Sequence, residues 1–113
     1  MALAVALGAF GAHALKGRLD AYAMGIWEKA VFYQAIHALG LVVTPLLAKA
    51  GLANADAASW ACGLLLAGIL LFSGSLYLLA LTGARALGAI APLGGAAFIA
   101  AWLVLGYAAA GRY

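Results

Sequence analysis

Residues 57–84, AASWACGLLLAGILLFSGSLYLLALTGA, form the longest stretch of this sequence without a charged side chain. Residues 1–15, 30–48 and 86–111 form three more such stretches, and the nine charged residues lie between the four stretches or at their ends. A helix on the surface of a soluble protein needs a polar outer face, whereas about 20 apolar residues suffice to span a bilayer. The pattern therefore predicts an all-α fold, a polytopic integral membrane protein that forms a four-transmembrane-helix bundle with short loops.

The composition supports a membrane location. Hydrophobic residues make up 69% of the 113 residues and charged residues 8%, which is far from the usual balance of a soluble protein. The net charge of +3 comes from cations that flank the apolar stretches, as topology determinants and headgroup contacts do. The sequence therefore predicts the lipid bilayer as a partner and excludes nucleic acid.

We predict a single transmembrane domain over residues 1–113. Its helices are expected at about residues 1–15, 27–48, 57–82 and 88–110. The first stretch reaches only about 22 Å at 1.5 Å per residue, which is short of the roughly 30 Å hydrocarbon core. Either the protein begins upstream of this sequence or the first helix is tucked against its neighbours.

Individual residues predict where the second and third helices begin and end. Trp27 is expected at the membrane interface, and Glu28 supplies an acid to the positive N-terminus of the second helix. Asp56 or Ser59 is expected to cap the third helix. Gly83 is expected to end it.

The positive-inside rule addresses the orientation of the bundle. If the first and third loops share one side, that side carries four basic residues and the other side carries two. The rule then places the first and third loops in the cytoplasm and both termini outside it. The two sets are Lys16, Arg18, Lys29 and Arg85 on one side and Lys49 and Arg112 on the other.

Three polar residues share a face of the second predicted helix, because Tyr33, Gln34 and His37 are spaced i, i+1, i+4. Lipid cannot satisfy an amide or an imidazole, so this face is expected to point into the bundle or into a wet cavity. A proton relay, a ligand pocket or a metal site would use such a face, and so would an interhelical hydrogen-bond cluster. We favour the hydrogen-bond cluster because such contacts are common between membrane helices.

The third predicted helix supplies the polar residues that complete this cluster. Ser73 and Tyr77 are spaced i, i+4 and share a face, whereas Ser75 lies about 200° away from Ser73. No acid or histidine in this stretch accompanies the serines, so we predict no catalytic residue. The predicted intramembrane polar cluster consists of Tyr33, Gln34, His37, Ser73 and Tyr77, with His13 and Ser75 as secondary candidates.

His13 lies near the end of the first predicted helix, where the helix dipole favours a histidine. Together with His37 it makes the one histidine pair of the chain, and two histidines from different helices can bind haem or a metal ion. The spacing carries no specificity, and no carboxylate lies nearby in an apolar stretch. We therefore predict no metal and no cofactor.

Small residues predict where helices approach closely. Ala4, Gly8 and Ala12 form a small-xxx-small stripe, and so do Gly106 and Ala110. The stripes favour tight contacts within the chain, and contacts between copies are the alternative.

Four short blocks, read together, resemble a known family. They are Gly8–His13 (GAFGAH), Tyr33–Ala38 (YQAIHA), Phe72–Tyr77 (FSGSLY) and Pro92–Gly95 (PLGG). In this order they resemble the family of small membrane proteins that includes bacterial YgdD and eukaryotic transmembrane protein 256. The resemblance implies four transmembrane helices and a bacterial cytoplasmic (inner) membrane location, and it implies no reaction. The matching residues are Phe10, His13, Tyr33, Gln34, His37, Ser73, Ser75, Tyr77, Pro92 and Gly94.

Two functions from different classes fit these residues. The first is a non-enzymatic structural or accessory protein that packs against itself, as a homo-oligomer, or against a larger membrane complex. The second is a small oligomeric channel or transporter with a polar path around His37. An enzyme ranks third, because the sequence has no paired carboxylates, no metal-ligand cluster and no nucleotide-binding loop.

Overall fold

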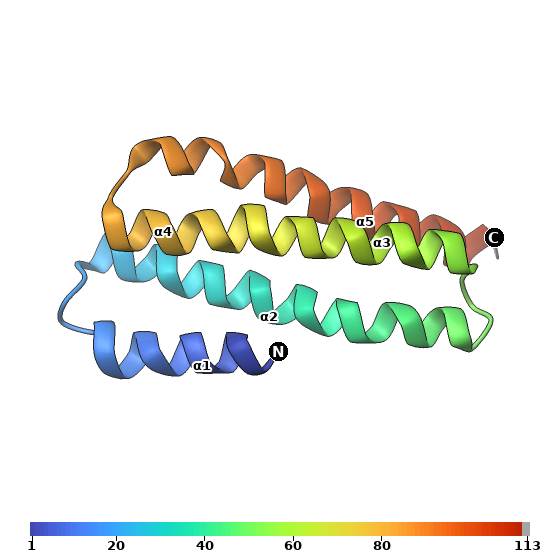
Figure 1. Cartoon of the computed structure of the whole chain (residues 1–113), viewed down its shortest axis with the longest axis horizontal. Coiled ribbons are helices and arrows are strands. Elements are labelled where there is room, and N and C mark those ends of the chain that lie inside the picture. Colours follow the sequence, from blue (N-terminus) through green and yellow to red (C-terminus); the bar gives the residue numbers. More distant parts are fainter. Residues whose placement is uncertain (112–113) are drawn as a thin grey trace.

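In a computed structural model that describes residues 1–111, the chain folds into four helical rods (Figure 1). The first rod is α1 with a π-helical turn, η1, and the second is the single long helix α2. The third joins α3, a π-helical turn (η2) and α4, and the fourth joins a 3₁₀ turn (η3) and α5. The bounds are α1 Ala2–Phe10, η1 Gly11–Leu15, α2 Ala21–Lys49, α3 Ala55–Gly68, η2 Ile69–Ser73, α4 Gly74–Thr82, η3 Arg85–Ala89 and α5 Ala91–Gly111.

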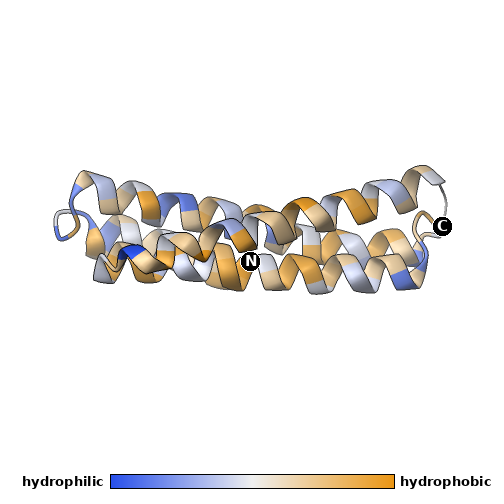
Figure 2. Ribbon diagram, turned by 90° about the horizontal axis from the view of Figure 1, so that it is seen from above, coloured by the Kyte–Doolittle hydropathy of each residue, from blue (hydrophilic) through white to orange (hydrophobic). Residues whose placement is uncertain are grey.

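The rods form an elongated antiparallel bundle that measures 49 × 26 × 15 Å (Figure 1). The first loop and the turn that leads into η3 lie at one end, and the loop between α2 and α3 lies at the other. Strongly hydrophilic residues lie mainly toward these two ends (Figure 2). Three segments are long and apolar enough to cross a membrane, namely Ala21–Lys49, Ala55–Thr82 and Arg85–Gly111.

The first rod is shorter than the other three. Helix α1 and η1 together cover Ala2–Leu15 and lie beside only the first half of α2, so the first residue lies near the middle of the bundle's length (Figure 1). The fourth rod begins at Arg85, three residues before the predicted start, because the 3₁₀ turn precedes α5. Arg112, which the positive-inside argument counts, lies outside the described residues.

The prediction that α2 begins at about residue 27 is wrong. The helix begins at Ala21, and Asp20 caps it by accepting a hydrogen bond from the backbone N–H of Ala23 at 2.7 Å. An aspartate in this position satisfies one of the free N–H groups of the first turn. The cap extends α2 by two turns, and the first loop shrinks to residues 16–20.

The predicted cap of α3 is also wrong, whereas its predicted end is confirmed. Asn54 caps the helix by accepting a hydrogen bond from the N–H of Ala57 at 2.7 Å, so Asp56 lies inside the first turn. At the end of α4, Gly83 adopts a left-handed conformation with a φ of 71°. This conformation favours glycine and ends the helix.

Glycines mark the closest contacts between the rods. A Cβ atom built on Gly94 of α5 would lie only 2.7 Å from the Cα of Phe72 in η2. Gly94 thus allows α5 and η2 to approach each other closely. Gly8 likewise faces Val31 of α2, whereas a Cβ on Gly106 would meet no atom within 4 Å. Ala4 and Gly8 of the predicted stripe therefore pack within the chain, whereas Ala12 and Gly106 are exposed.

Candidate functional site

Two hydrogen bonds join α2 to the third rod in the middle of the bundle. The hydroxyl of Tyr77 donates to Oε1 of Gln34 at 2.5 Å. The hydroxyl of Ser73 donates to the backbone carbonyl of Ala30 at 2.7 Å. Gln34 and Ser73 are buried, so water cannot reach their polar groups, and each bond supplies a partner from within the protein. The structure thus brings together Gln34, Ser73 and Tyr77, as the sequence predicts.

The imidazole of His37 is buried between α2 and α5. Its Nδ1 atom lies 2.7 Å from the backbone carbonyl of Tyr33. Because a carbonyl oxygen only accepts, Nδ1 carries the proton and donates this bond. The ring stacks on Phe98 with the ring centroids 3.5 Å apart and the planes 14° apart. Within residues 1–111, Nε2 of His37 makes no hydrogen bond. His37 is held by its own helix and by an aromatic face, and not by the other polar residues of the cluster.

Tyr33 lies at the margin of the predicted polar face. The residue is 36% exposed, and its hydroxyl makes no hydrogen bond within residues 1–111. The ring instead joins an aromatic group, with centroids 4.7 Å from Phe72 and 6.1 Å from His37. The expectation that Tyr33 belongs to the buried hydrogen-bond cluster is therefore wrong. Successive helical residues lie 100° apart, so Gln34 points inward while its neighbour lies at the edge.

Trp27 is buried, although the sequence pattern predicts it at the membrane interface. It is 3% exposed, and its indole N–H donates to the carbonyl of Leu7 in α1 at 3.0 Å. The indole covers Gly11 and meets the ring of Tyr77 edge-on, with centroids 4.6 Å apart. Trp27 thus connects the short first rod to the polar cluster. A periodic pattern alone cannot find this role, because the interfacial assignment followed from a wrong start of α2.

The secondary candidates do not join the cluster. Ser75 donates to the carbonyl of Phe72 in its own rod at 3.0 Å, and His13 is exposed in η1. Ten residues of α2, about 15 Å of helix, separate Trp27, which contacts η1, from His37. The structure therefore does not bring the two histidines together as a pair of axial ligands.

Comparison with known proteins places this bundle in a family. Residues 7–95 match the family described as "Protein of unknown function (DUF423)". The chain belongs to the DUF423 family. A UPF0382 membrane protein of Staphylococcus epidermidis is 54% identical over 103 residues, which cover 91% of this chain and 82% of the relative. UPF0382 membrane protein YwdK of Bacillus subtilis is 49% identical over 109 residues, which cover 95% of this chain and 86% of the relative. No solved structure matches the chain.

The DUF423 match confirms the predicted resemblance to a family of small membrane proteins. It also confirms the membrane class and the bacterial inner-membrane location, because the relatives are bacterial membrane proteins and the long helices are apolar. The matched residues 7–95 include the whole predicted polar cluster.

The polar cluster of this DUF423 protein lines none of five surface cavities. These cavities have volumes between 280 and 630 Å³ and open on the described part of the chain. Neither Gln34, His37 nor Tyr77 borders any of them. Among residues 1–111, every fully buried side-chain nitrogen or oxygen atom has a hydrogen-bond partner. The bonds of Gln34, Ser73 and Tyr77 are suited to holding helices together, because they are made within the chain, whereas Nε2 of His37 remains without a partner among residues 1–111.

Proposed function

We propose that this DUF423 protein is a non-enzymatic structural or accessory component of a membrane assembly, in which all four helical rods lie in the bilayer. The observation that carries the proposal is the pair of bonds from Tyr77 to Gln34 and from Ser73 to the Ala30 carbonyl. Both bonds use polar groups to join two rods of the same chain. A catalytic or transporting residue needs a polar group that remains free for a substrate or an ion.

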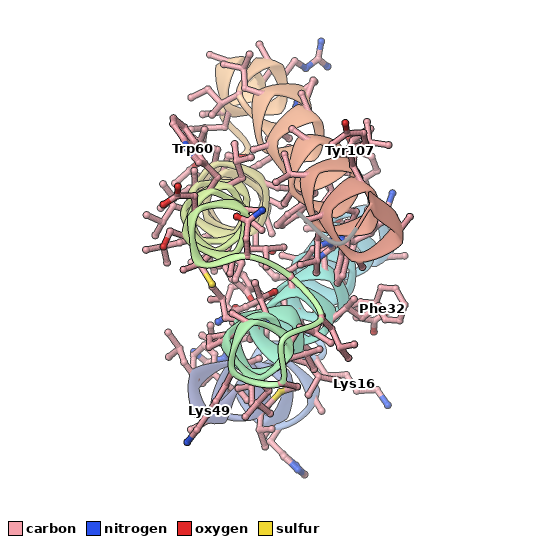
Figure 3. All side chains as sticks on the ribbon, turned by 90° about the vertical axis from the view of Figure 1, so that its right-hand side faces the viewer. Lys16, Phe32, Lys49, Trp60 and Tyr107 are labelled. Atoms are coloured by element: carbon pink, nitrogen blue, oxygen red, sulfur yellow. The ribbon has the colours of Figure 1, made fainter. Side chains whose placement is uncertain are left out.

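The outer surface supports an assembly role. Large apolar side chains point away from the bundle on several rods, as Phe32, Trp60 and Tyr107 show in Figure 3. Gly106 leaves a small residue facing outward beside Tyr107 on α5. Outward small residues let another helix approach closely, either from a second copy or from a larger complex.

A small oligomeric channel or transporter is the second candidate. The observation that favours it is the partly exposed ring of Tyr33, which stacks parallel to the buried ring of His37 with an interplanar angle of 8°. In an oligomer, a polar path would begin at the Tyr33 hydroxyl and reach Nε2 of His37. A single bundle of 15 Å thickness is thin for a pore, so this function requires several copies.

The test consists of two measurements, the ion flux through the protein and the size of its assembly. The full-length protein is reconstituted into vesicles, and proton, sodium and potassium flux is measured against protein-free vesicles. We expect no added flux, and we expect native lipid nanodiscs to contain the protein in a complex of fixed stoichiometry. Flux that His37→Leu abolishes, in a variant that stays folded, would favour the channel. A monomer without partners in native nanodiscs would contradict the assembly role.

A further inference from the structure

The largest of the five cavities lies at the end of the bundle where the first loop meets the turn after α4 (Figure 1, left end). It has a volume of about 630 Å³. One wall comes from the first loop and the start of α2, and the other comes from the end of α4 and from η3. Its polar and charged lining residues are Arg18, Asp20, Tyr22 and Arg85, and its apolar ones include Leu19, Ile26 and Leu79.

Two arginines from separate loops reach this cavity. Arg18 comes from the first loop and Arg85 from the first residue of η3, so the fold brings them together across 67 residues of sequence. Neither guanidinium forms an ion pair within residues 1–111. The one carboxylate in the lining, Asp20, uses Oδ1 to cap α2. The cavity therefore carries a net charge of +1 from two arginines and one aspartate.

The position of the cavity selects the chemistry of its ligand. It lies at the end of the bundle, where the apolar helices meet the charged loops. In a bilayer, this end of the helices lies at the level of the lipid headgroups. The loops at this end carry Lys16, Arg18 and Arg85, whereas the described part of the other end carries only Lys49. Arginine binds phosphate through two parallel N–H···O bonds, because the N–H groups of its planar guanidinium match the spacing of the phosphate oxygens.

We propose that this cavity binds a phosphate group, with Arg18 and Arg85 as its ligands, and that an anionic phospholipid supplies it. The glycerol and the first acyl carbons of such a lipid would lie against Leu19, Ile26 and Leu79. The phenol of Tyr22 adds a hydrogen-bond donor at the rim. A free phosphate ion uses the same two arginines but leaves the apolar wall uncovered, and this difference separates the two sources.

The test measures binding of short-chain phosphatidylglycerol to the purified full-length protein in a neutral detergent by native mass spectrometry. The double variant Arg18→Gln, Arg85→Gln should lower the affinity by about tenfold or more, the loss expected for removing charge-assisted hydrogen bonds. The double variant Lys16→Gln, Lys29→Gln is the matched control, because it also removes two positive charges but neither lysine lines the cavity. Its affinity should stay within about twofold of the unmodified protein, as for a surface charge.

A third variant and a competitor complete the test. Asp20→Asn keeps the cap, since asparagine caps a helix as well as aspartate, and it should tighten binding because it removes the repelling carboxylate. If inorganic phosphate binds as tightly as the lipid, the site takes the free ion and not the headgroup. Equal losses in the double lysine variant and in the double arginine variant would overturn the site, because binding would then follow net charge. Circular dichroism confirms that each variant is helical, and the single arginine variants replace the double variant if it fails to fold.

Discussion

Gln34 and Tyr77 illustrate how one pair of side chains can join two membrane helices. Lipid offers no hydrogen-bond partner, so a buried amide in a membrane helix needs one from the protein. Tyr77 supplies it at 2.5 Å, while its ring packs edge-on against Trp27. The tyrosine therefore contributes through its hydroxyl and through its ring, and a substitution can separate the two contributions.

Tyr77→Phe should lower the free energy of unfolding by about 0.6 kcal/mol, the average for hydrogen bonds between membrane helices. The substitution keeps the ring against Trp27 and leaves Oε1 of Gln34 without its donor. Reversible unfolding in bicelles by a denaturing detergent measures the change. Tyr107→Phe is the matched control, because Tyr107 is 74% exposed. This variant should unfold at the same detergent fraction as the unmodified protein. Equal effects of both substitutions would show that the bond to Gln34 adds no stability.

At the scale of whole elements, glycines and aromatic rings determine how closely the rods pack. Gly94 of α5 lies against the backbone of η2, and the ring of Phe98 fits against Gly68 at the end of α3. Gly11 of η1 accommodates the indole of Trp27 in the same way. Close packing is a main source of stability between membrane helices, because lipid tails are as apolar as the helix surfaces and the hydrophobic effect therefore does not drive the helices together.

Gly94→Ala should destabilise the bundle by about 1–3 kcal/mol, the usual range for overpacking a filled interior. Its added methyl group would overlap the backbone of Phe72, which cannot move aside as a flexible side chain does. Gly106→Ala on the same helix is the control, because its Cβ meets nothing within 4 Å and alanine favours a helix. Thermal unfolding in detergent compares the two variants, and similar melting temperatures would contradict the close contact between α5 and η2.

At the scale of the whole molecule, the antiparallel order of the rods separates the charged residues. The first loop and η3 share one end, and that end carries Lys16, Arg18 and Arg85. The described part of the other end carries one basic residue, Lys49. Basic loops are retained in the cytoplasm, so the charge difference predicts that the end with the first loop and η3 faces the cytoplasm.

Cysteine labelling tests this orientation in a Cys62→Ala background. Ala50→Cys in the loop after α2 should react with a membrane-impermeant maleimide on intact cells. Ala21→Cys and Ala84→Cys should react only after lysis, since both lie at the basic end. All three positions are exposed, so differences in labelling report the side of the membrane and not burial. Labelling of Ala50→Cys and Ala84→Cys from the same side would contradict a third rod that spans the bilayer.

The sequence by itself determined the membrane class, the all-α fold and the approximate course of the helices, because charge-free stretches of this length are tolerated in lipid and not in water. Helical periodicity also placed Gln34 and His37 on a buried face and Ser73 with Tyr77. Only the tertiary structure decided that Tyr77 bonds to Gln34, that Trp27 is buried and that Tyr33 lies at the edge. It also placed Arg18 and Arg85 in the lining of one cavity. Hydropathy depends on one residue and its near neighbours, whereas a partner on another helix depends on how far each rod is rotated and shifted, and packing at positions such as Gly94 determines that.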